Sequence, residues 1–195
     1  HGPVIQLNNG SWLIPQEGID PGGKEPKVWV SRSTDAGETW EFHGMVSDSK
    51  DEIGFWELRL LQIPSGRILA TMRTQEANFY QSHSDDQGKT WSPYRDTGLW
   101  CHGSSPLDML LLEDGSVLCT YGQRREPYGI YACLLTNEGE RWHYDDQVTL
   151  REGAPDDDFG YPNSELMDDG SILTVYYWHQ EGQTRHLASI RWTLH

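Results

Sequence analysis

A ten-residue motif recurs along this chain at a fixed spacing. It reads SRSTDAGETW at 31–40 and SHSDDQGKTW at 82–91, and a weaker copy, LLTNEGERW, ends at Trp142. Its acidic or amide position falls at Asp35, Asp86 and Asn137, so both steps (86 − 35 and 137 − 86) are 51 residues. A period of about 50 residues is typical of repeat architectures. The chain is therefore expected to be an array of similar units.

The motif has the chemistry of a tight turn. An Asp or Asn side chain accepts hydrogen bonds from backbone amides two residues further on, and Gly adopts positive φ without strain. A second landmark accompanies it, because hairpin signals between apolar runs place turn glycines at Gly10, Gly66, Gly115 and Gly170. Each unit thus combines one hairpin turn with one Asp-Gly turn, and the tryptophan that follows is expected to pack against its own unit.

The positions of these turns predict four short antiparallel strands per unit. In the second unit they are FWELRLLQI, RILATMR, NFYQSHS and PYRDTGLW. This is the sequence form of a β-propeller blade, and the fold class is predicted as all-β. We expect a single domain over 1–195 that contains only part of a propeller, with blades at about 1–50, 51–101, 102–152 and 153–195. The fourth would lack its Asp-Gly turn and outer strand.

Composition excludes several classes of partner. The formal net charge of −15 argues against nucleic acid or an anionic membrane surface as the main partner. No apolar segment is long enough to span a bilayer, no signal peptide is recognised, and nothing predicts a cofactor. The first residue, His1, falls inside a predicted strand, so we expect that processing or truncation removed something before it.

Cysteine and metal-ligand patterns carry little functional signal. Cys119 and Cys133 fall in predicted strands, where buried free thiols behave as small hydrophobes, and Cys101 is the third cysteine. No Cys or His spacing predicts zinc, and the Asp-Gly turns lack the ligand pattern of a calcium loop. The acidic run PDDDFG is better explained as a solvated loop than as a metal site.

The turn glycines serve as a ruler for finding candidate site residues. Nine positions before them stand His1, Glu57, Pro106 and Tyr161. In a propeller these innermost strands line the central channel, so three of the four positions bring chemically active side chains to its mouth. Glu57 lies in an apolar run, where a carboxylate needs a partner, and Arg73 at the end of the next strand is the candidate.

Arg124 and Arg125 occupy the corresponding strand end of the third unit, in GQRREPYG. Arginines at the corresponding strand ends of two units suggest a pair of guanidinium groups that bind one carboxylate. Tyr161 could instead be a ring packed between units, with its hydroxyl bonded to backbone.

A family resemblance becomes specific at this point. The S-x-D-x-G-x-T-W motifs resemble the Asp boxes of sialidases and related BNR-repeat propellers. ELRLLQIPSGRILATMR, 57–73, resembles the sialidase segment that runs from the catalytic glutamate to the second arginine of the substrate-binding triad. GYPNSELMDDGSILTVYY, 160–177, resembles the segment that opens with the nucleophilic tyrosine. Sialidase domains have six blades, so this chain resembles the four C-terminal ones.

The resemblance implies a function and a role for each residue. Tyr161 would be the nucleophile and Glu57 its base, and Arg73 with Arg124 or Arg125 would bind the substrate carboxylate. The third family arginine has no counterpart in YGIYACLLT, and the first arginine and the acid/base aspartate belong to blades that this chain lacks. The resemblance also favours a secreted or periplasmic location, which the residues themselves leave open.

Three functional hypotheses follow. The first is a sialidase-like exo-glycoside hydrolase acting on terminal acidic sugars of glycans. The second is a related propeller hydrolase for uronate-containing glycans, in which His1 would bind substrate or act in catalysis. The third is a non-catalytic glycan-binding propeller. Fewer than six blades would also leave open strand edges, through which the chain could self-associate or which would mark a fragment.

Overall fold

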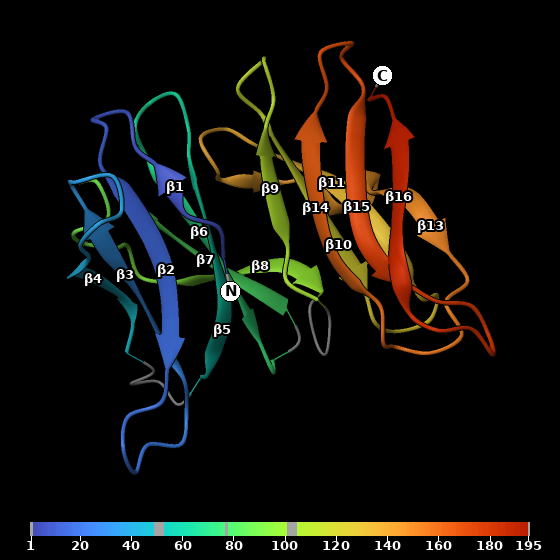
Figure 1. Ribbon diagram of the computed structural model, residues 1–195, viewed down its shortest axis with the longest axis horizontal. Helices are drawn as coiled ribbons and strands as arrows, with labels where there is room; N and C mark the ends of the chain where they lie inside the picture. Colours follow the sequence, from blue (N-terminus) through green and yellow to red (C-terminus); the bar gives the residue numbers. More distant parts are fainter. Residues whose placement is uncertain (1, 49–52, 77, 101–104, 195) are drawn as a thin grey trace. The chain divides into compact units, whose positions relative to one another are not determined.

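In the part of the chain that the structure describes, the fold consists of β-strands and one short 3-10 helix. The computed structural model describes residues 2–48, 53–76, 78–100 and 105–194 (Figure 1). Its strands form four antiparallel sheets of three to five strands. The prediction of an all-β chain is confirmed. Among the described residues, none forms a helix with the length and apolar character that crossing a bilayer requires.

Sheets 1 and 2 have the same strand order. Sheet 1 contains β1 (Ile5–Gln6), β2 (Trp12–Gly18), β3 (Lys27–Ser33) and β4 (Glu41–Ser47) in that order. Sheet 2 contains β5 (Phe55–Gln62), β6 (Ile68–Thr74), β7 (Asn78–Ser84) and β8 (Arg95–Trp100). Each strand pairs with the next one in sequence, as expected for strands joined by short turns.

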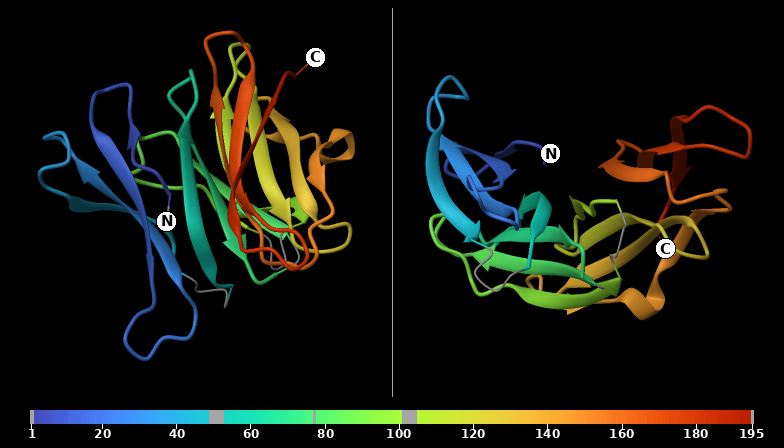
Figure 2. Two further views of the ribbon diagram at one scale, coloured as in Figure 1. Left: turned by 45° about the vertical axis from the view of Figure 1, so that its right-hand side comes forward. Right: turned by 90° about the horizontal axis from the view of Figure 1, so that it is seen from below.

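Sheets 3 and 4 depart from the four-stranded pattern. Sheet 3 contains β9 (Asp108–Leu111), β10 (Val117–Gln123), β11 (Gly129–Thr136), β12 (Arg141–Trp142) and β13 (Val148–Glu152), with the helix η1 (Tyr144–Asp146) before β13. Both β12 and β13 pair with β11. Among the described residues, sheet 4 has three strands, β14 (Gly160–Leu166), β15 (Ile172–Trp178) and β16 (His186–Trp192). Figure 2 shows these strands from two further directions.

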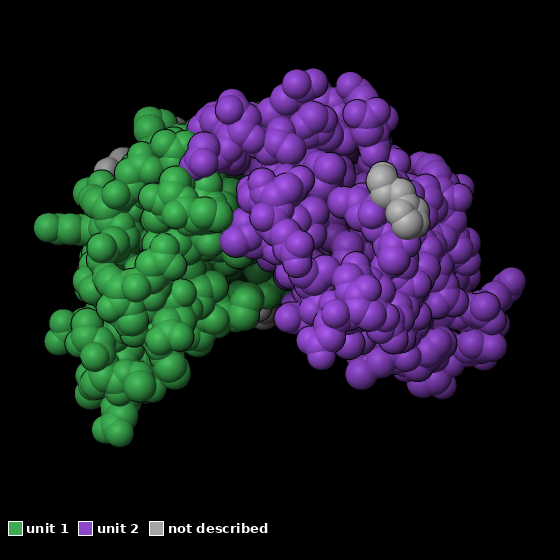
Figure 3. Space-filling model, turned by 90° about the horizontal axis from the view of Figure 1, so that it is seen from above, with its two compact units in different colours: residues 1–97 green, residues 98–195 purple. Residues whose placement is uncertain are grey.

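The chain divides into two compact units, residues 1–97 and 98–195 (Figure 3). In the first, the apolar faces of sheets 1 and 2 pack together, with Leu13 and Val30 from one and Leu58 and Met72 from the other fully buried. In the second, sheets 3 and 4 share smaller clusters. A sheet buries its apolar face only against another layer, so each unit contains its own core. A single domain with blade boundaries near 50, 101 and 152 stays a prediction.

The predicted hairpin turns are confirmed. In all four, the amide of the turn glycine donates to the carbonyl three residues earlier, as from Gly10 to Leu7 at 2.8 Å and from Gly170 to Met167 at 2.9 Å. Each glycine has φ between 79° and 93°, a conformation that a side chain would strain. These turns set the register between the first two strands of every sheet.

The Asp boxes are closed by hydrogen bonds within the motif. In the first box the amide of Gly37 donates to Ser33 Oγ at 2.8 Å, and the amide of Thr39 donates to Asp35 Oδ1 at 3.0 Å. The half-buried Trp40 ring donates from Nε1 to the Gly37 carbonyl at 3.0 Å. The second box repeats each of these bonds. The tryptophan is thus tied to its own loop, as predicted.

This bonding predicts an acid-sensitive contribution to stability. Hydrogen bonds from the Thr39 side chain and backbone and from Ser33 lower the pKa of Asp35 to about 2, against about 3.9 in an unfolded chain. The folded state then binds fewer protons, so the contribution is complete above about pH 4 and is lost as the pH falls through about 2. Asp35→Asn should have a lower free energy of unfolding than the unsubstituted protein above about pH 4, as measured by urea denaturation. The difference between the two proteins should shrink as the pH falls toward about 2. Parallel pH curves would contradict this, and Thr34→Ala in the same loop is the control.

Two of the three cysteines behave as predicted. Cys119 on β10 and Cys133 on β11 are directly paired across the ladder, and both are buried free thiols. Burial raises the pKa of Cys133 to about 12, so this thiol is neutral and unreactive at physiological pH. Cys101 lies outside the described residues.

Candidate functional site

Glu57 and Tyr161 share an unusual backbone conformation. Glu57 on β5 has φ of 52° and Tyr161 on β14 has φ of 53°, values that non-glycine residues seldom adopt. Each lies at a register shift where two residues of the inner strand oppose one on its neighbour, which is a β-bulge. Bulges and left-handed residues concentrate at functional sites, where they redirect a side chain. Pro106 lies outside any strand and has no such conformation.

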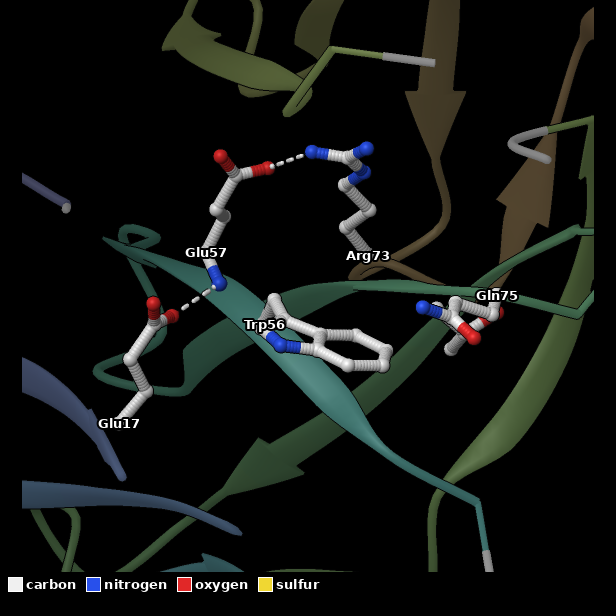
Figure 4. Close-up of a pocket in the computed structure, with 6 residues that line it drawn as sticks. Glu17, Trp56, Glu57, Arg73 and Gln75 are labelled. Atoms are coloured by element: carbon white, nitrogen blue, oxygen red, sulfur yellow. Dashed lines mark hydrogen bonds and ion pairs between the residues drawn. The ribbon is translucent and has the colours of Figure 1, made fainter. Parts of the chain in front are cut away.

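Glu57 and Arg73 face one another in a cavity of the first unit. Arg73 Nη1 donates to Glu57 Oε2 at 2.9 Å, with the glutamate side chain 6% exposed and the arginine side chain 25% exposed. A buried carboxylate needs such a partner, because removal from water is costly for an unpaired charge. The cavity encloses about 330 Å³ and is lined by Glu17, Trp56, Glu57, Arg73, Thr74 and Gln75 (Figure 4). The two predicted residues are brought together.

Glu17 and Trp56 were not anticipated as cavity residues. The Glu17 side chain accepts a hydrogen bond from the backbone amide of Glu57, and the Trp56 indole lies along β5 beside it (Figure 4). A signal for Glu17 was present in the sequence. Seven positions after the turn glycines stand Glu17, Arg73, Gly122 and Tyr177, each the last residue but one of the second strand of its sheet. A constant spacing after the turn glycine therefore marks Glu17 and Tyr177, as the spacing before it marks Glu57 and Tyr161.

Tyr161 belongs to an aromatic and cationic cluster in the second unit. The Tyr161 and Tyr177 ring centroids are 5.9 Å apart, and the Arg124 guanidinium lies 5.7 Å from the Tyr161 ring and 6.0 Å from the Tyr177 ring. Arg124 Nε donates to the Phe159 carbonyl at 2.8 Å, and Nη2 donates to the Tyr177 hydroxyl at 2.5 Å. Arg124 is thereby held over both rings in a favourable cation–π geometry.

The acidic loop PDDDFG forms the outer part of this cluster. The Tyr177 hydroxyl donates to Asp158 Oδ1 at 2.8 Å, and Arg185 pairs with Oδ2 of the same carboxylate. Burial and the bond to Asp158 raise the pKa of Tyr177 to about 12, so its phenol stays protonated at neutral pH. Asp156 pairs with His179 at 2.8 Å. Among the described residues no group of His, Cys, Asp or Glu is arranged to hold a metal ion.

The two neighbouring arginines have different surroundings. Arg124 contacts Tyr161, whereas the Arg125 guanidinium lies 4.3 Å from the Trp100 ring centroid. Arg125 lines a separate cavity of about 200 Å³ with Tyr121, Tyr144 and Gln147 among its walls. Of the two candidates for a carboxylate clamp, Arg124 is the one beside Tyr161. His1 lies outside the described residues.

Antiparallel sheets with Asp-box turns, and a glutamate–arginine pair and a tyrosine at inner-strand bulges, define a β-propeller with a glycosidase-like fold. The sequence model of one family, described as the BNR repeat-like domain, matches residues 1–174. The chain therefore belongs to the BNR repeat-like domain family, and the predicted BNR-repeat propeller fold is confirmed.

Solved structures agree with this assignment. A protein of unknown function from Dyadobacter fermentans is 28% identical, with a TM-score of 0.88 over 99% of this chain and 53% of that one. The α-L-arabinanase of Penicillium chrysogenum, complexed with arabinobiose, is 20% identical, with a TM-score of 0.75 over 96% of this chain and 61% of that one.

The intramolecular trans-sialidase of Ruminococcus gnavus, in complex with oseltamivir carboxylate, is 17% identical, with a TM-score of 0.72 over 98% of this chain and 43% of that one. The chain thus spans roughly half the length of the solved propellers that it resembles. A search among curated proteins finds no match.

Proposed function

We propose that the chain carries catalytic residues of a sialidase-like exo-glycoside hydrolase acting on terminal acidic sugars of glycans. The observation that carries this proposal is the equivalence of Glu57 and Tyr161. Both residues interrupt the inner strand of their sheet with a bulge, and both have φ close to 50°. Each also has an arginine beside it, Arg73 for Glu57 and Arg124 for Tyr161. A purely structural repeat has no need of strain and charge at these positions.

The residue types suit a substrate that carries a carboxylate. A carboxylate nucleophile would be repelled by the negative charge of such a sugar, whereas a neutral phenol approaches it without this penalty. In the proposed reaction Tyr161 Oη attacks the anomeric carbon while Glu57 accepts the phenolic proton. The bond from the anomeric carbon to the glycosidic oxygen breaks, and the aglycone leaves with that oxygen and takes up a proton from solvent, so the sugar becomes covalently bound to Tyr161. Water then attacks the anomeric carbon, its hydroxyl stays on the sugar and its other proton goes to solvent, and Glu57 returns the phenolic proton to Tyr161.

Arg73 and Arg124 have the role of holding the substrate carboxylate. Arginine suits this role because its planar fork matches a carboxylate and its charge persists at any physiological pH. Both guanidinium groups are already oriented by protein contacts, Arg73 by Glu57 and Arg124 by the Phe159 carbonyl and Tyr177. Such preorganisation lowers the entropy cost of binding. With a chain charge of −15, these arginines also supply the local attraction that an anionic sugar needs.

Separate alanine substitutions of the two neighbouring arginines distinguish a residue that binds the substrate carboxylate from a surface charge. Arg124→Ala should raise KM for an acidic substrate by roughly 10- to 100-fold, because a charge-assisted hydrogen bond contributes about 1.5–3 kcal/mol. Arg125→Ala should change KM by less than about threefold, because surface changes away from a site cost little. Steady-state kinetics of both variants make the comparison. Equal effects, or a larger effect of Arg125→Ala, would remove Arg124 from the proposed clamp.

A second candidate function is a related propeller hydrolase that acts on a different sugar, such as a uronate-containing glycan. One observation favours it, because Glu17 brings a second carboxylate to the cavity that holds Glu57. Two carboxylates are the usual equipment of glycosidases, and the similar Penicillium protein is an arabinanase. In this case Tyr161 would bind the sugar rather than attack it. A non-catalytic glycan-binding propeller is the third possibility.

A panel of fluorogenic glycosides separates these functions. It contains a sialoside, a glucuronide and an arabinofuranoside, each incubated with the 195-residue chain and with the longest natural polypeptide that includes it. Selective turnover of the sialoside is the expected result. Turnover of either other glycoside would favour the second candidate, and glycan binding by the folded protein without any turnover would favour a binding propeller.

A further inference from the structure

The backbone amide of Glu57 has an unusual environment. At the bulge, the ladder between β5 and β6 passes from the pair Trp56–Arg73 to the pair Arg59–Thr71, so two residues of β5 oppose a single residue of β6. A backbone N–H at such an irregularity inside a protein needs an acceptor. For Glu57 that acceptor is a side-chain carboxylate, Oε2 of Glu17, which comes from β2 of the neighbouring sheet.

Two bonds therefore hold the two ends of one residue. Glu17 binds the main chain of Glu57, and Arg73 binds its carboxylate, as Figure 4 shows. Left-handed φ is unfavourable for a residue with a side chain, so the conformation persists only where surrounding groups support it. A charged acceptor makes a stronger hydrogen bond than a neutral one. The carboxylate of Glu17 is thus suited to support the strained conformation that directs Glu57 toward Arg73.

The second unit supports its own bulge from the equivalent position. Seven residues after the turn glycine of sheet 3 is Gly122, which corresponds to Glu17 in sheet 1. A Cβ added at Gly122 would lie 3.1 Å from Gly160 Cα, immediately before Tyr161. The same place in the preceding sheet therefore lies close to the bulged segment in both units, through backbone packing in one and through a carboxylate in the other.

We propose that Glu17 is a positioning residue for Glu57. Its carboxylate fixes the amide of Glu57 in the left-handed conformation, which aims the Glu57 side chain at Arg73 and into the cavity. The importance of this positioning for turnover rests on the proposed function, in which Glu57 is the base. The conformational effect itself does not, so it is measured separately.

Nuclear magnetic resonance of the isotopically labelled full chain tests the conformational effect. The Glu57 amide proton should resonate downfield, as expected for an amide bound to a carboxylate. It should move upfield in Glu17→Ala and by a smaller amount in Glu17→Gln, which keeps an oxygen acceptor but loses the charge. Glu41→Ala, at an exposed glutamate on β4 of the same unit, is the matched control and should leave it in place. An unchanged Glu57 amide in Glu17→Gln and Glu17→Ala would overturn the proposal.

Kinetics test the functional consequence on the substrate that the glycoside panel identifies. Glu17→Ala should lower kcat by roughly 10- to 100-fold with a smaller change in KM, because misplacement of a catalytic group by about 1 Å has effects of this size. Glu17→Gln should recover part of the loss. If Glu17→Ala does not fold, the Glu17→Gln amide shift and kcat decide. A rise in KM with unchanged kcat would make Glu17 a substrate contact and overturn the positioning role.

The failure of the two proposals can be told apart. Absence of turnover on every glycoside would refute the proposed function, while the Glu57 amide shift would still decide whether Glu17 holds its conformation. Turnover with an unchanged kcat in both Glu17 variants would refute the positioning role and leave the proposed function standing.

Discussion

Tyr161→Phe should abolish turnover while leaving the fold and substrate binding intact. The change removes one oxygen atom, and the ring that contacts Arg124 and Tyr177 remains. If that oxygen is the nucleophile, its loss should lower kcat on the order of 10³-fold or more, as for other covalent catalysts. Binding is measured by calorimetry with a substrate analogue, and turnover by release of the fluorophore. Tyr144→Phe, at an exposed tyrosine of the same unit, is the control and should retain full activity.

A covalent intermediate gives this prediction a second measurement. Acid quenching during turnover, followed by mass spectrometry of peptides, should find the sugar mass on the peptide that contains Tyr161. The adduct should be missing in Tyr161→Phe. Retention of most activity by this variant would exclude Tyr161 as nucleophile and favour a mechanism that uses the carboxylates of Glu17 and Glu57.

The turns of this fold could be predicted from the sequence because their determinants are local. Positive φ at Gly10 or Gly37 depends on the absence of a side chain at that residue. The Asp35 carboxylate binds amides within its own loop. Because the sequence repeats at a constant period, one assigned turn locates the equivalent turns in the other units. The order of strands within each sheet then follows, since consecutive strands are joined by these turns. Five-stranded sheet 3 was not anticipated, because β12 and β13 both pair with β11 and the repeat does not encode this.

The candidate site could be predicted only in part. Glu57 and Tyr161 stand out because an ionisable or phenolic side chain interrupts an apolar strand at a constant distance from a turn. The choice between Arg124 and Arg125 depends on which direction each side chain takes at the end of β10. Spacing from a turn does not encode that direction. The contact of Asp158 with Tyr177 joins a loop to a strand that follows it by 19 residues, which no local pattern reveals.

Gly160→Ala should cause a large loss of stability in the second unit. A Cβ at this position would lie 2.6 Å from Ser105 Oγ and 2.7 Å from Ser105 Cβ, and Ser105 is fully buried. Overpacking of this kind costs about 1–3 kcal/mol, and the strained φ of 124° adds roughly 1–2 kcal/mol more. We expect the free energy of unfolding, measured by urea denaturation, to fall by about 2–5 kcal/mol.

Gly153→Ala is the matched control for this change. Gly153 also has positive φ, 90°, but a Cβ there would meet nothing within 4 Å. Its loss should therefore be limited to backbone strain, about 1 kcal/mol. Ser105→Gly in the Gly160→Ala background removes the clashing atoms and should restore part of the difference in a double-mutant cycle. Equal losses at Gly160 and Gly153 would mean that close packing of Gly160 on Ser105 does not support the bulge. In that event the Arg124 contact would account for the orientation of Tyr161 better than the approach of β14 to Gly122.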